Sequence, residues 1–449
     1  MTEQARFTAS SLLFSAAVLT SAALIFIFGA FGLPGNSAIT GGYLLVTIAS
    51  ALILGRQEGD RPVVTSMDAV FAVLAIAVTI ASVLHFDSSD YKEYMLLAVS
   101  VPSGYATGRL LGNPVLTSIR LRLLQVSAPL VAAACIATVP NLVGEIYPKP
   151  FVFGFDHATT VFAIAFGYMV IAYIYSDIEW RSKISLCLLA LTVCATAVFV
   201  ASTVRFVLIA ILLTALFALA CSIFRPLRIW RRIALVLLAM ILGVIVGTVA
   251  RYDFVVRVGN LLAHTGTFSG IAKPEQNVVK VERAETGHGP GITDRLPGDP
   301  ARSDGATGRA PAIDDPPSCD KTFDLNNSIA IRRALLGDAL FFVPKAGWFG
   351  FGLDSFPRMS CFQGYEIHNS VLQAIVEFGW IAGAVLVIMI IIPFMQFLFG
   401  RREFDLNRQF MLSCITFALL LSLIYGRTSR DLTLFLFLGA FANANSKIG

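Results

Sequence analysis

The chain has 449 residues, of which 56% are hydrophobic and only 14% are charged, and its mean hydropathy is +0.74. Soluble globular proteins carry about 25% charged residues, so this composition excludes a soluble domain and predicts a polytopic membrane protein. The formal net charge of +5 is small. The Lys and Arg residues lie mostly in connections between apolar stretches, which is typical of inner loops and not of a nucleic-acid-binding surface.

About twelve apolar stretches are long enough to cross a bilayer as helices. The first is longer than the apolar segment of a signal peptide and no clear cleavage site follows it, so we expect a retained span. The fourth and the twelfth are short and are interrupted by proline, glycine or asparagine. The expected spans are approximately 11–33, 39–55, 67–86, 91–107, 122–140, 157–176, 184–202, 204–223, 232–250, 370–399, 408–425 and 430–445.

Basic residues mark alternate connections as cytoplasmic. They follow the second, fourth, sixth, eighth and tenth expected spans, whereas the connection after the third span is acidic. Because cytoplasmic loops are enriched in Lys and Arg, we expect both termini on the cytoplasmic side. The basic residues that set this orientation are Arg56, Arg61, Arg109, Arg120, Arg122, Arg181, Lys183, Arg225, Arg228, Arg231, Arg232, Arg401, Arg402 and Arg408.

One long outer connection divides the chain into three parts. Residues 1–250 form a membrane domain with spans one to nine, residues 251–368 form a large periplasmic loop, and residues 369–449 hold spans ten to twelve. Within the loop, about 273–317 is rich in Gly, Pro, Asp, Arg and Ser and cannot bury enough apolar surface to become ordered, so we expect a mobile insert. Apolar residues then return and predict a helix at about 327–343.

Cys319 and Cys361 both lie in this loop, whereas the other five of the seven cysteines lie inside apolar spans. Within a span, cysteine usually acts as a small hydrophobic residue. In an oxidising compartment the two loop cysteines could form a disulfide. The sequence leaves the bonded and the free forms open, because geometry decides between them.

Four arginines depart from the charge pattern and lie at the outer face: Arg205, Arg332, Arg427 and Arg430. A guanidinium stays charged and its fork of donors matches phosphate oxygens. These residues are therefore candidates for binding a diphosphate. Arg205, at the outer start of the eighth span, could instead be an interfacial anchor.

The other outer arginines also have structural interpretations. Adjacent residues of a helix point in different directions, so either Arg332 or Arg333 could be a solvated helix charge. Arg427 or Arg430 could pair with Asp431. The sequence leaves substrate contact and structural pairing open for each.

His368 lies between these arginines, at the start of a helix that meets the membrane. An imidazole with an ordinary pKa near ~6.5 can take a proton from an attacking sugar hydroxyl at neutral pH. It could instead donate a hydrogen bond to a diphosphate, or be only a satisfied polar residue. Tyr365 and Asn369 flank the histidine and could orient it.

The sequence contains no phosphate-binding loop, no HExxH motif and no Cys or His pairing with the spacing of metal ligands. We therefore expect no metal and no cofactor. In such a mechanism the arginines would supply the charge stabilisation that a divalent ion supplies elsewhere.

The segment from Arg332 to Gly383 resembles the O-antigen ligase and O-antigen polymerase superfamily of bacterial lipid-linked glycan transferases. The family pattern contains an arginine followed three residues later by leucine. Arg332 and Leu335 match this pattern, and so do Arg333 and Leu336.

The second part of the family pattern is His-Asn, a nine-residue gap and a glycine, which His368, Asn369 and Gly379 match. The next glycine, Gly383, comes one residue later than the usual ligase spacing, which bears on ligase against polymerase but not on the superfamily. Arg205 resembles the arginine that the family carries near the outer end of a central span.

The resemblance implies an all-α, GT-C-like glycosyltransferase of the bacterial inner membrane, with its active site on the periplasmic side. The donor would be a glycan on undecaprenyl diphosphate, and transfer would invert the anomeric carbon without metal or ATP. Arg205 and Arg332 would hold the diphosphate, and His368 would activate the acceptor hydroxyl or assist the diphosphate.

Three functions fit these features to different degrees. An O-antigen ligase, which moves finished glycan onto lipid A–core, is favoured by the single dominant outer loop. A polymerase of O-antigen or exopolysaccharide repeat units more often has two substantial outer loops. A transporter of lipid-linked sugar would carry ionisable residues near the midplane in repeated halves, whereas here the charges gather at one face and no halves repeat.

Overall fold

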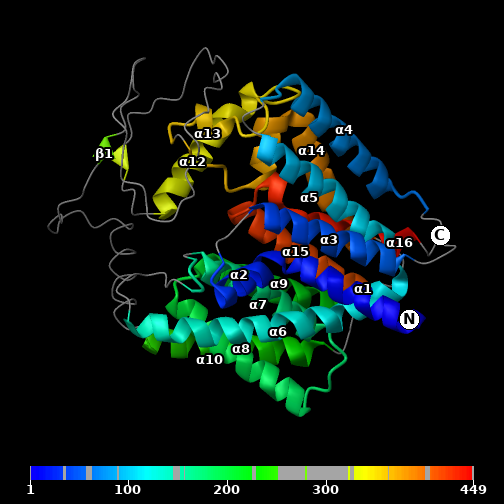
Figure 1. The fold of residues 1–449 in the computed structure, drawn as a ribbon, viewed down its shortest axis with the longest axis vertical. Coiled ribbons are helices and arrows are strands. Elements are labelled where there is room, and N and C mark those ends of the chain that lie inside the picture. Colours follow the sequence, from blue (N-terminus) through cyan, green and yellow to red (C-terminus); the bar gives the residue numbers. More distant parts are fainter. Residues whose placement is uncertain are drawn as a thin grey trace.

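The protein is built almost entirely from helices (Figure 1). The computed structural model describes residues 2–33, 37–56, 63–87, 91–144, 152–155, 157–224, 229–250, 279–280, 322–323, 328–362, 364–399 and 405–446. The N-terminal helices are α1 (Glu3–Val18), α2 (Thr20–Phe31), α3 (Ser37–Gly55), α4 (Ser66–Leu84), α5 (Tyr91–Leu110), α6 (Asn113–Gly144), α7 (Ala158–Ile174), α8 (Lys183–Ala201), α9 (Arg205–Phe224) and α10 (Trp230–Ala250).

The C-terminal part adds further helices and one short pair of strands. Strand β1 (Val279–Lys280) pairs antiparallel with β2 (Thr322–Phe323). The helices that follow are α12 (Ser328–Phe342), α13 (Phe356–Met359), α14 (Ser370–Phe399), α15 (Leu406–Ile424) and α16 (Leu432–Ser446), with short 3-10 turns η2 (Val343–Lys345) and η3 (Thr428–Arg430). Helix α12 occupies the part of the loop for which a helix was expected. Apart from β1, the expected mobile insert at about 273–317 lies outside the described residues.

Within the described residues, seven helices are long and apolar enough to cross a membrane, namely α4, α6, α8, α9, α10, α14 and α15. Helices α1 and α2 pass the same test as one bent pair, and α3, α7 and α16 are apolar but shorter. The prediction of a multi-pass, helical membrane protein is therefore confirmed. Every expected span falls on a helix, but the described residues provide seven or eight candidate crossings, so the count of twelve stays a prediction.

The first expected span, 11–33, is not one straight helix. Helices α1 and α2 meet at Leu19 with a bend of 81°. Hydroxyl groups on both sides of the bend bond back to the preceding turn: Ser15 Oγ donates to the carbonyl of Ser11 and Thr20 Oγ1 donates to that of Ala17, both at 2.8 Å. Bonds of this kind bend helices, and hydropathy alone does not reveal them.

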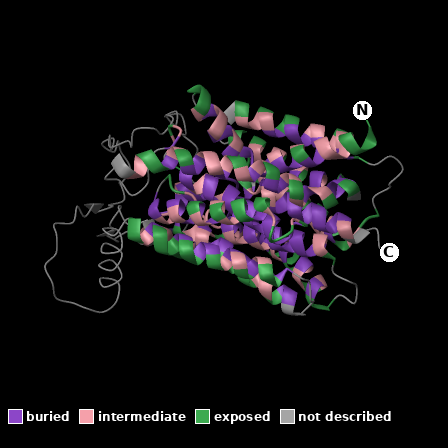
Figure 2. Ribbon diagram, turned by 90° about the horizontal axis from the view of Figure 1, so that it is seen from below, coloured by how far each residue is buried: buried purple, intermediate pink, exposed green. Residues whose placement is uncertain are grey.

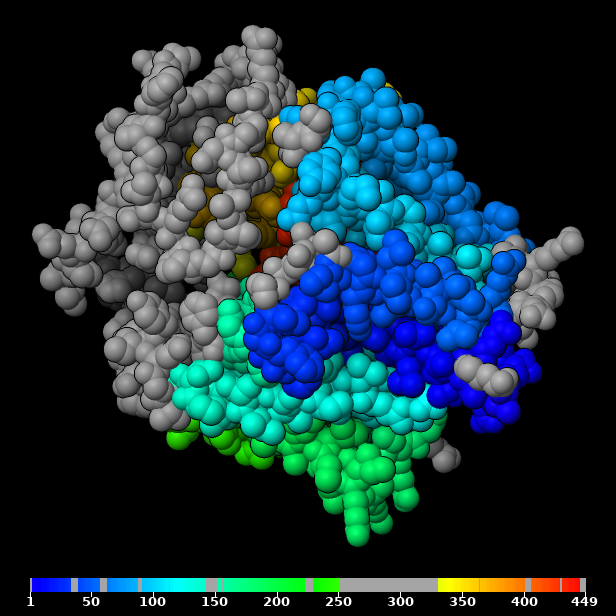
Figure 3. Space-filling model, in the orientation of Figure 1, coloured from blue at the N-terminus to red at the C-terminus, as the bar shows by residue number. Residues whose placement is uncertain are grey.

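Both chain ends lie at one end of the bundle, and α12 and α13 lie at the other (Figure 1). On the face shown in Figure 3, α1 and α3 lie between α4 and α5 on one side and α6 on the other. Buried residues gather inside the bundle and exposed residues follow its outer helices (Figure 2). Many exposed side chains are large and apolar, such as Val83 and Leu238, which are 73% and 62% exposed. Such a surface suits contact with lipid.

Glycines allow two helix pairs to pack closely. Gly108 of α5 and Gly439 of α16 each lie against the backbone of the other helix, where a Cβ would overlap it. Gly243 and Gly247 of α10 meet α8 in the same way. Small residues at helix interfaces are typical of membrane proteins, because apolar lipid gives little drive for association and close packing provides it.

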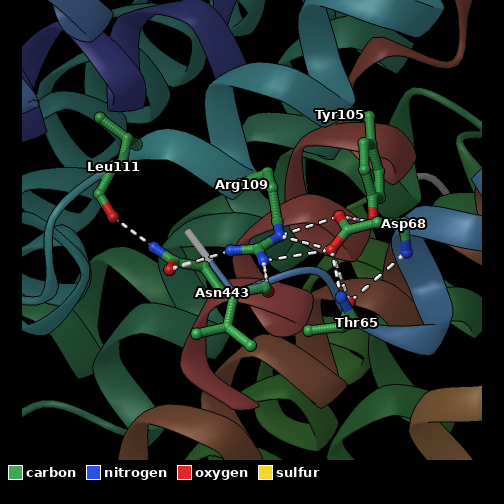
Figure 4. Close-up of polar contacts among 7 residues, drawn as sticks. Thr65, Asp68, Tyr105, Arg109, Leu111 and Asn443 are labelled. Atoms are coloured by element: carbon green, nitrogen blue, oxygen red, sulfur yellow. Dashed lines mark hydrogen bonds and ion pairs between the residues drawn. The ribbon is translucent and has the colours of Figure 1, made fainter. Parts of the chain in front are cut away.

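A buried ion pair joins the ends of three helices (Figure 4). Arg109, in the last turn of α5, is only 5% exposed, and its Nε lies 2.9 Å from Oδ1 of Asp68 in α4. Tyr105 donates to the same carboxylate oxygen at 2.9 Å, and Arg109 Nη1 donates to Asn443 of α16 at 3.4 Å. Asp68 also forms a capping box with Thr65 at the start of α4. Arg109, expected as a loop charge, is therefore part of the packed bundle.

Helix α14 is broken at Gly379, whose φ is 89° and ψ is 177°. The glycine-rich turn after α12 packs against the break and satisfies its backbone. The amide of Phe351 donates to the carbonyl of Val376 at 3.0 Å, and the amide of Trp380 donates to that of Gly347 at 2.9 Å. Non-helical backbone at membrane depth requires such partners from the protein. The expected span 370–399 is thus a short segment, 370–378, followed by a long one, 380–399.

Replacing Gly379 by alanine should destabilise the protein by about 1–3 kcal/mol. The new residue would need a positive φ, and its Cβ would overlap the carbonyl of Trp348. Thermal unfolding of the detergent-purified protein measures the effect. Gly337→Ala is the matched control, because open space surrounds Gly337 in α12 and the change should be neutral or slightly stabilising. Equal unfolding temperatures of the two variants would contradict this explanation of the break.

Asp68→Ala should reduce the free energy of unfolding by on the order of 3 kcal/mol, because Arg109 would remain charged and buried without its carboxylate. Tyr105→Phe removes one hydrogen bond to the same carboxylate and should cost about 1 kcal/mol. Denaturation of both variants, followed by circular dichroism, makes the comparison. A loss for Asp68→Ala no greater than that for Tyr105→Phe would refute a stabilising role of the ion pair.

Candidate functional site

A cavity of about 310 Å³ lies between the start of α9, helix α12, the loop before α14 and the end of α15. Among the described residues its lining is formed by Phe206, Arg332, Arg333, Leu335, Leu336, Ile367, His368, Asn369, Leu423 and Ile424. Three of the predicted site residues, Arg332, His368 and Asn369, therefore meet in one place. The lining is mainly apolar and carries a few polar groups, which is typical of a site for an amphipathic ligand.

Arg332 is held between two aromatic rings. Its Cζ lies 4.9 Å from the ring centre of Phe206 and 4.7 Å from that of Tyr425. Such contacts contribute about 0.5–2 kcal/mol each and fix the guanidinium without using its hydrogen-bond donors. Nη1 of Arg332 is buried and has no hydrogen-bond partner. Since buried donors are almost always paired, this one is placed to receive an acceptor from a ligand.

Helix α12 carries Arg332 and is fixed by a small core of its own. Its inner face, with Leu335 and Phe342, packs against Phe356 and against Val376 of α14. Further along α12, buried Asp338 accepts hydrogen bonds from Ser360 Oγ at 2.8 Å and from the amide of Cys361 at 3.0 Å. The position of Arg332 therefore depends on the loop that leads to α14.

Cys361 is disulfide-bonded. Cys319, its predicted partner, lies outside the described residues. The cysteines inside the helices, Cys135, Cys187, Cys194, Cys221 and Cys414, are free.

His368 lies half-buried in the loop before α14. Burial, followed by the nearby charge of Arg332, lowers the pKa of its imidazole below the ordinary value of 6.5, and Glu366 partly opposes the shift. The neutral imidazole therefore dominates at neutral pH. A neutral imidazole can accept a proton, as general base catalysis requires.

Asn369 has a structural task that the sequence did not assign to it. Its Oδ1 accepts a hydrogen bond from the amide of Leu372 at 3.0 Å, which caps the start of α14. Its Nδ2 donates to the carbonyl of Leu423 at 3.4 Å, at the end of α15. Tyr365 is 45% exposed and is not among the described residues that line the cavity.

Arg427 is surrounded by carboxylates. It is 4% exposed, and its guanidinium lies 2.6 Å from Asp354, 2.5 Å from Glu366 and 3.3 Å from Glu93. Burial opposes its charge, but these carboxylates, together with that of Glu377, raise its pKa above the ordinary value. Most of its donors are therefore occupied, and the interpretation of Arg427 as a diphosphate ligand does not fit this geometry.

The pairing with Asp431 that the sequence left open is replaced by other contacts. Asp431 accepts a hydrogen bond from Ser422 Oγ. Arg430 has a side chain that is 52% exposed and lies 2.7 Å from Glu93. Arg427 and Arg430 therefore both contact Glu93 in the first turn of α5. The sequence had indicated this region only as an acidic outer connection.

Arg205 is exposed and is the first residue of α9. Its neighbour Phe206 lines the cavity and contacts Arg332. Arg205 itself is not among the described lining residues. Arg205 therefore lies at a helix start that borders the cavity, but it does not itself line the cavity.

Sequence reasoning missed the two rings, Phe206 and Tyr425, that hold Arg332. Each ring adjoins a feature that was singled out: Phe206 follows Arg205, and Tyr425 precedes Arg427 by two residues. No periodic pattern links these positions to α12. Among the described residues, no group of three or more His, Cys, Asp or Glu side chains is arranged to hold a metal ion.

The resemblance noted from the sequence finds neither support nor contradiction among known proteins. No protein-family model matches the chain. No curated protein and no solved structure is significantly similar to it. The family of this multi-pass membrane protein therefore stays a prediction, carried by the motif residues and by the cavity in which they meet.

Proposed function

We propose that this protein is an O-antigen ligase, a metal-independent, inverting glycosyltransferase of the bacterial inner membrane. It transfers a glycan from undecaprenyl diphosphate to lipid A–core on the periplasmic side. Both termini are cytoplasmic in this proposal, and the cavity opens toward the outer leaflet. The lipid bilayer, the lipid-linked donor and the lipid-borne acceptor are its partners.

The free donor of Arg332 is the observation that carries the proposal. A half-buried arginine whose Nη1 is buried and unpaired, in an apolar cavity next to His368, suits a phosphate group attached to a hydrocarbon chain. Phosphate oxygens would pair the donor, and the apolar lining would contact the first carbons of the lipid. A soluble anion would leave that lining without a partner.

The residues divide the reaction between them. Neutral His368 accepts the proton of the acceptor hydroxyl as its oxygen attacks the anomeric carbon of the donor sugar. The bond from that carbon to the diphosphate oxygen breaks on the opposite face, so the configuration inverts. Arg332 stabilises the negative charge that develops on the departing lipid diphosphate. Arg205, at the start of α9, adds a second positive charge beside it.

The choice of ligase over polymerase rests on the lengths of the expected outer connections. One long connection, 251–368, precedes the histidine, and the other outer candidate, 141–156, is short. The transporter is disfavoured because Arg332, His368 and Asn369 gather at one cavity between α9, α12 and α15.

A transfer assay tests the proposal directly. Purified protein receives undecaprenyl-diphosphate glycan with either lipid A–core or a second lipid-linked repeat, and the products are separated by gel electrophoresis. We expect glycan on lipid A–core. Extension of the lipid-linked glycan would instead identify a polymerase, and movement across the bilayer without transfer would identify a transporter.

Two neighbouring arginines provide a matched pair for the same assay. Arg332→Ala should lower the transfer rate roughly a hundredfold or more, as loss of a donor that stabilises developing charge does. Arg333→Ala should lower it less than about tenfold, because Arg333 is exposed and its charge is screened by solvent. Equal losses in the two variants would contradict the special role of Arg332.

The rate should fall on the acid side with a midpoint below pH 6.5, because the pKa of His368 is lowered from that value and protonation removes the base. Arg332→Gln removes one cause of the lowered pKa, so the midpoint of its residual activity should move to higher pH. Initial rates measured between about pH 5 and 8 check both statements. An acid limb above pH 6.5 in the unaltered protein would contradict the assignment of His368 as base.

A further inference from the structure

The loop that carries His368 is tied on both sides to the end of α15 and to the connection that follows it. Before the histidine, Glu366 Oε1 lies 2.5 Å from Nη1 of Arg427. After it, Asn369 Nδ2 donates to the carbonyl of Leu423 at 3.4 Å. The imidazole therefore sits between two anchors, Arg427 in the connection after α15 and Leu423 at the end of α15.

Arg427 is the stronger of the two anchors. It is buried, and besides Glu366 it contacts Asp354 of the glycine-rich turn at 2.6 Å and Glu93 of α5 at 3.3 Å. One guanidinium thus joins α5 and two parts of the stretch between α12 and α14 to the connection after α15. A buried charge compensated in this way is costly to unpair, so a substrate phosphate would have to displace carboxylates in order to reach it.

We propose that Arg427 is a positioning residue for His368. It holds Glu366, and Glu366 in turn fixes the histidine loop and keeps a carboxylate beside the imidazole that lines the cavity. This assignment rests on the proposed function only where it concerns catalysis by His368. The coupling between Glu366 and His368 is a property of the protein without substrate.

The charges around the imidazole come from several elements. Arg332 and Arg333 of α12 line the same cavity, and Arg205 begins the helix whose second residue lines it. Glu366 is the carboxylate of the histidine's own loop, and it acts on His368 against Arg332. Tyr425 lies at the end of α15, against Arg332.

Glu366→Gln isolates this coupling, since glutamine keeps an oxygen for Arg427 and loses the charge. The rate at which diethyl pyrocarbonate modifies each histidine is measured against pH by mass spectrometry on the purified full-length protein, without substrate. Only the neutral imidazole reacts, so the midpoint of the rate profile reports its protonation. We expect the midpoint at His368 to move to lower pH by roughly half a unit, because a nearby negative charge has been removed.

Glu93→Gln is the matched control. Glu93 also contacts Arg427, but it belongs to the first turn of α5 and not to the loop that carries His368. Its replacement should leave the midpoint at His368 unchanged, and His157 serves as an internal reference in both variants. The proposal would be overturned if the midpoint at His368 did not move in Glu366→Gln, moved to higher pH, or moved equally in both variants.

Transfer kinetics separate positioning from substrate binding. Arg427→Lys keeps the charge but loses the fork, so we expect kcat to fall at least about tenfold while KM for the lipid-linked donor stays unchanged. A raised KM with unchanged kcat would make Arg427 a substrate ligand and would overturn the assignment. If neither the unaltered protein nor any variant shows transfer, the proposed function fails. The modification profiles, which need no substrate, still test whether Arg427 and Glu366 position His368.

Discussion

Buried backbone groups must find hydrogen-bond partners inside the protein, and the candidate site depends on how this is achieved at Gly379. The break in α14 leaves carbonyls that the glycine-rich turn pairs through its amides. The same backbone hydrogen bonds hold the turn against the first segment of α14. They thereby fix the position of the start of that segment. His368 and Asn369 stand at this beginning, and Asn369 caps the helix. A glycine at a break therefore determines the place of an imidazole eleven residues earlier.

Arginines serve two different purposes in this molecule. Arg109 and Arg427 are surrounded by carboxylates or carbonyls and join segments that are distant in sequence. Arg332 is held by rings instead and keeps a buried donor unpaired. Arg427 also has one buried donor without a hydrogen-bond partner, Nε. What distinguishes Arg332 is that it lines the cavity and is contacted by rings and not by carboxylates.

Hydropathy predicted where the helices lie, because lipid selects long apolar stretches whatever their neighbours. It did not predict the bend at Leu19 or the break at Gly379, which follow from hydroxyl bonds and a close approach of distant backbone. For the site, the sequence grouped Arg332 with His368 through their expected common place at the outer face and through the family resemblance. For Arg427 the sequence left substrate contact and pairing with Asp431 open. Its actual acidic partners come from α5 and from two loops, and no local sequence pattern predicts them.

The rings around Arg332 have a consequence for ligand affinity. Phe206 and Tyr425 belong to the membrane bundle, whereas Arg332 belongs to α12, so the stacked guanidinium fastens the outer helix to the helices below. An anion bound at Nη1 would need α12 in this docked arrangement. Its apparent affinity would then scale with the fraction of molecules that hold the arrangement before the ligand arrives. Thermodynamic linkage makes the occupied form the more tightly docked one.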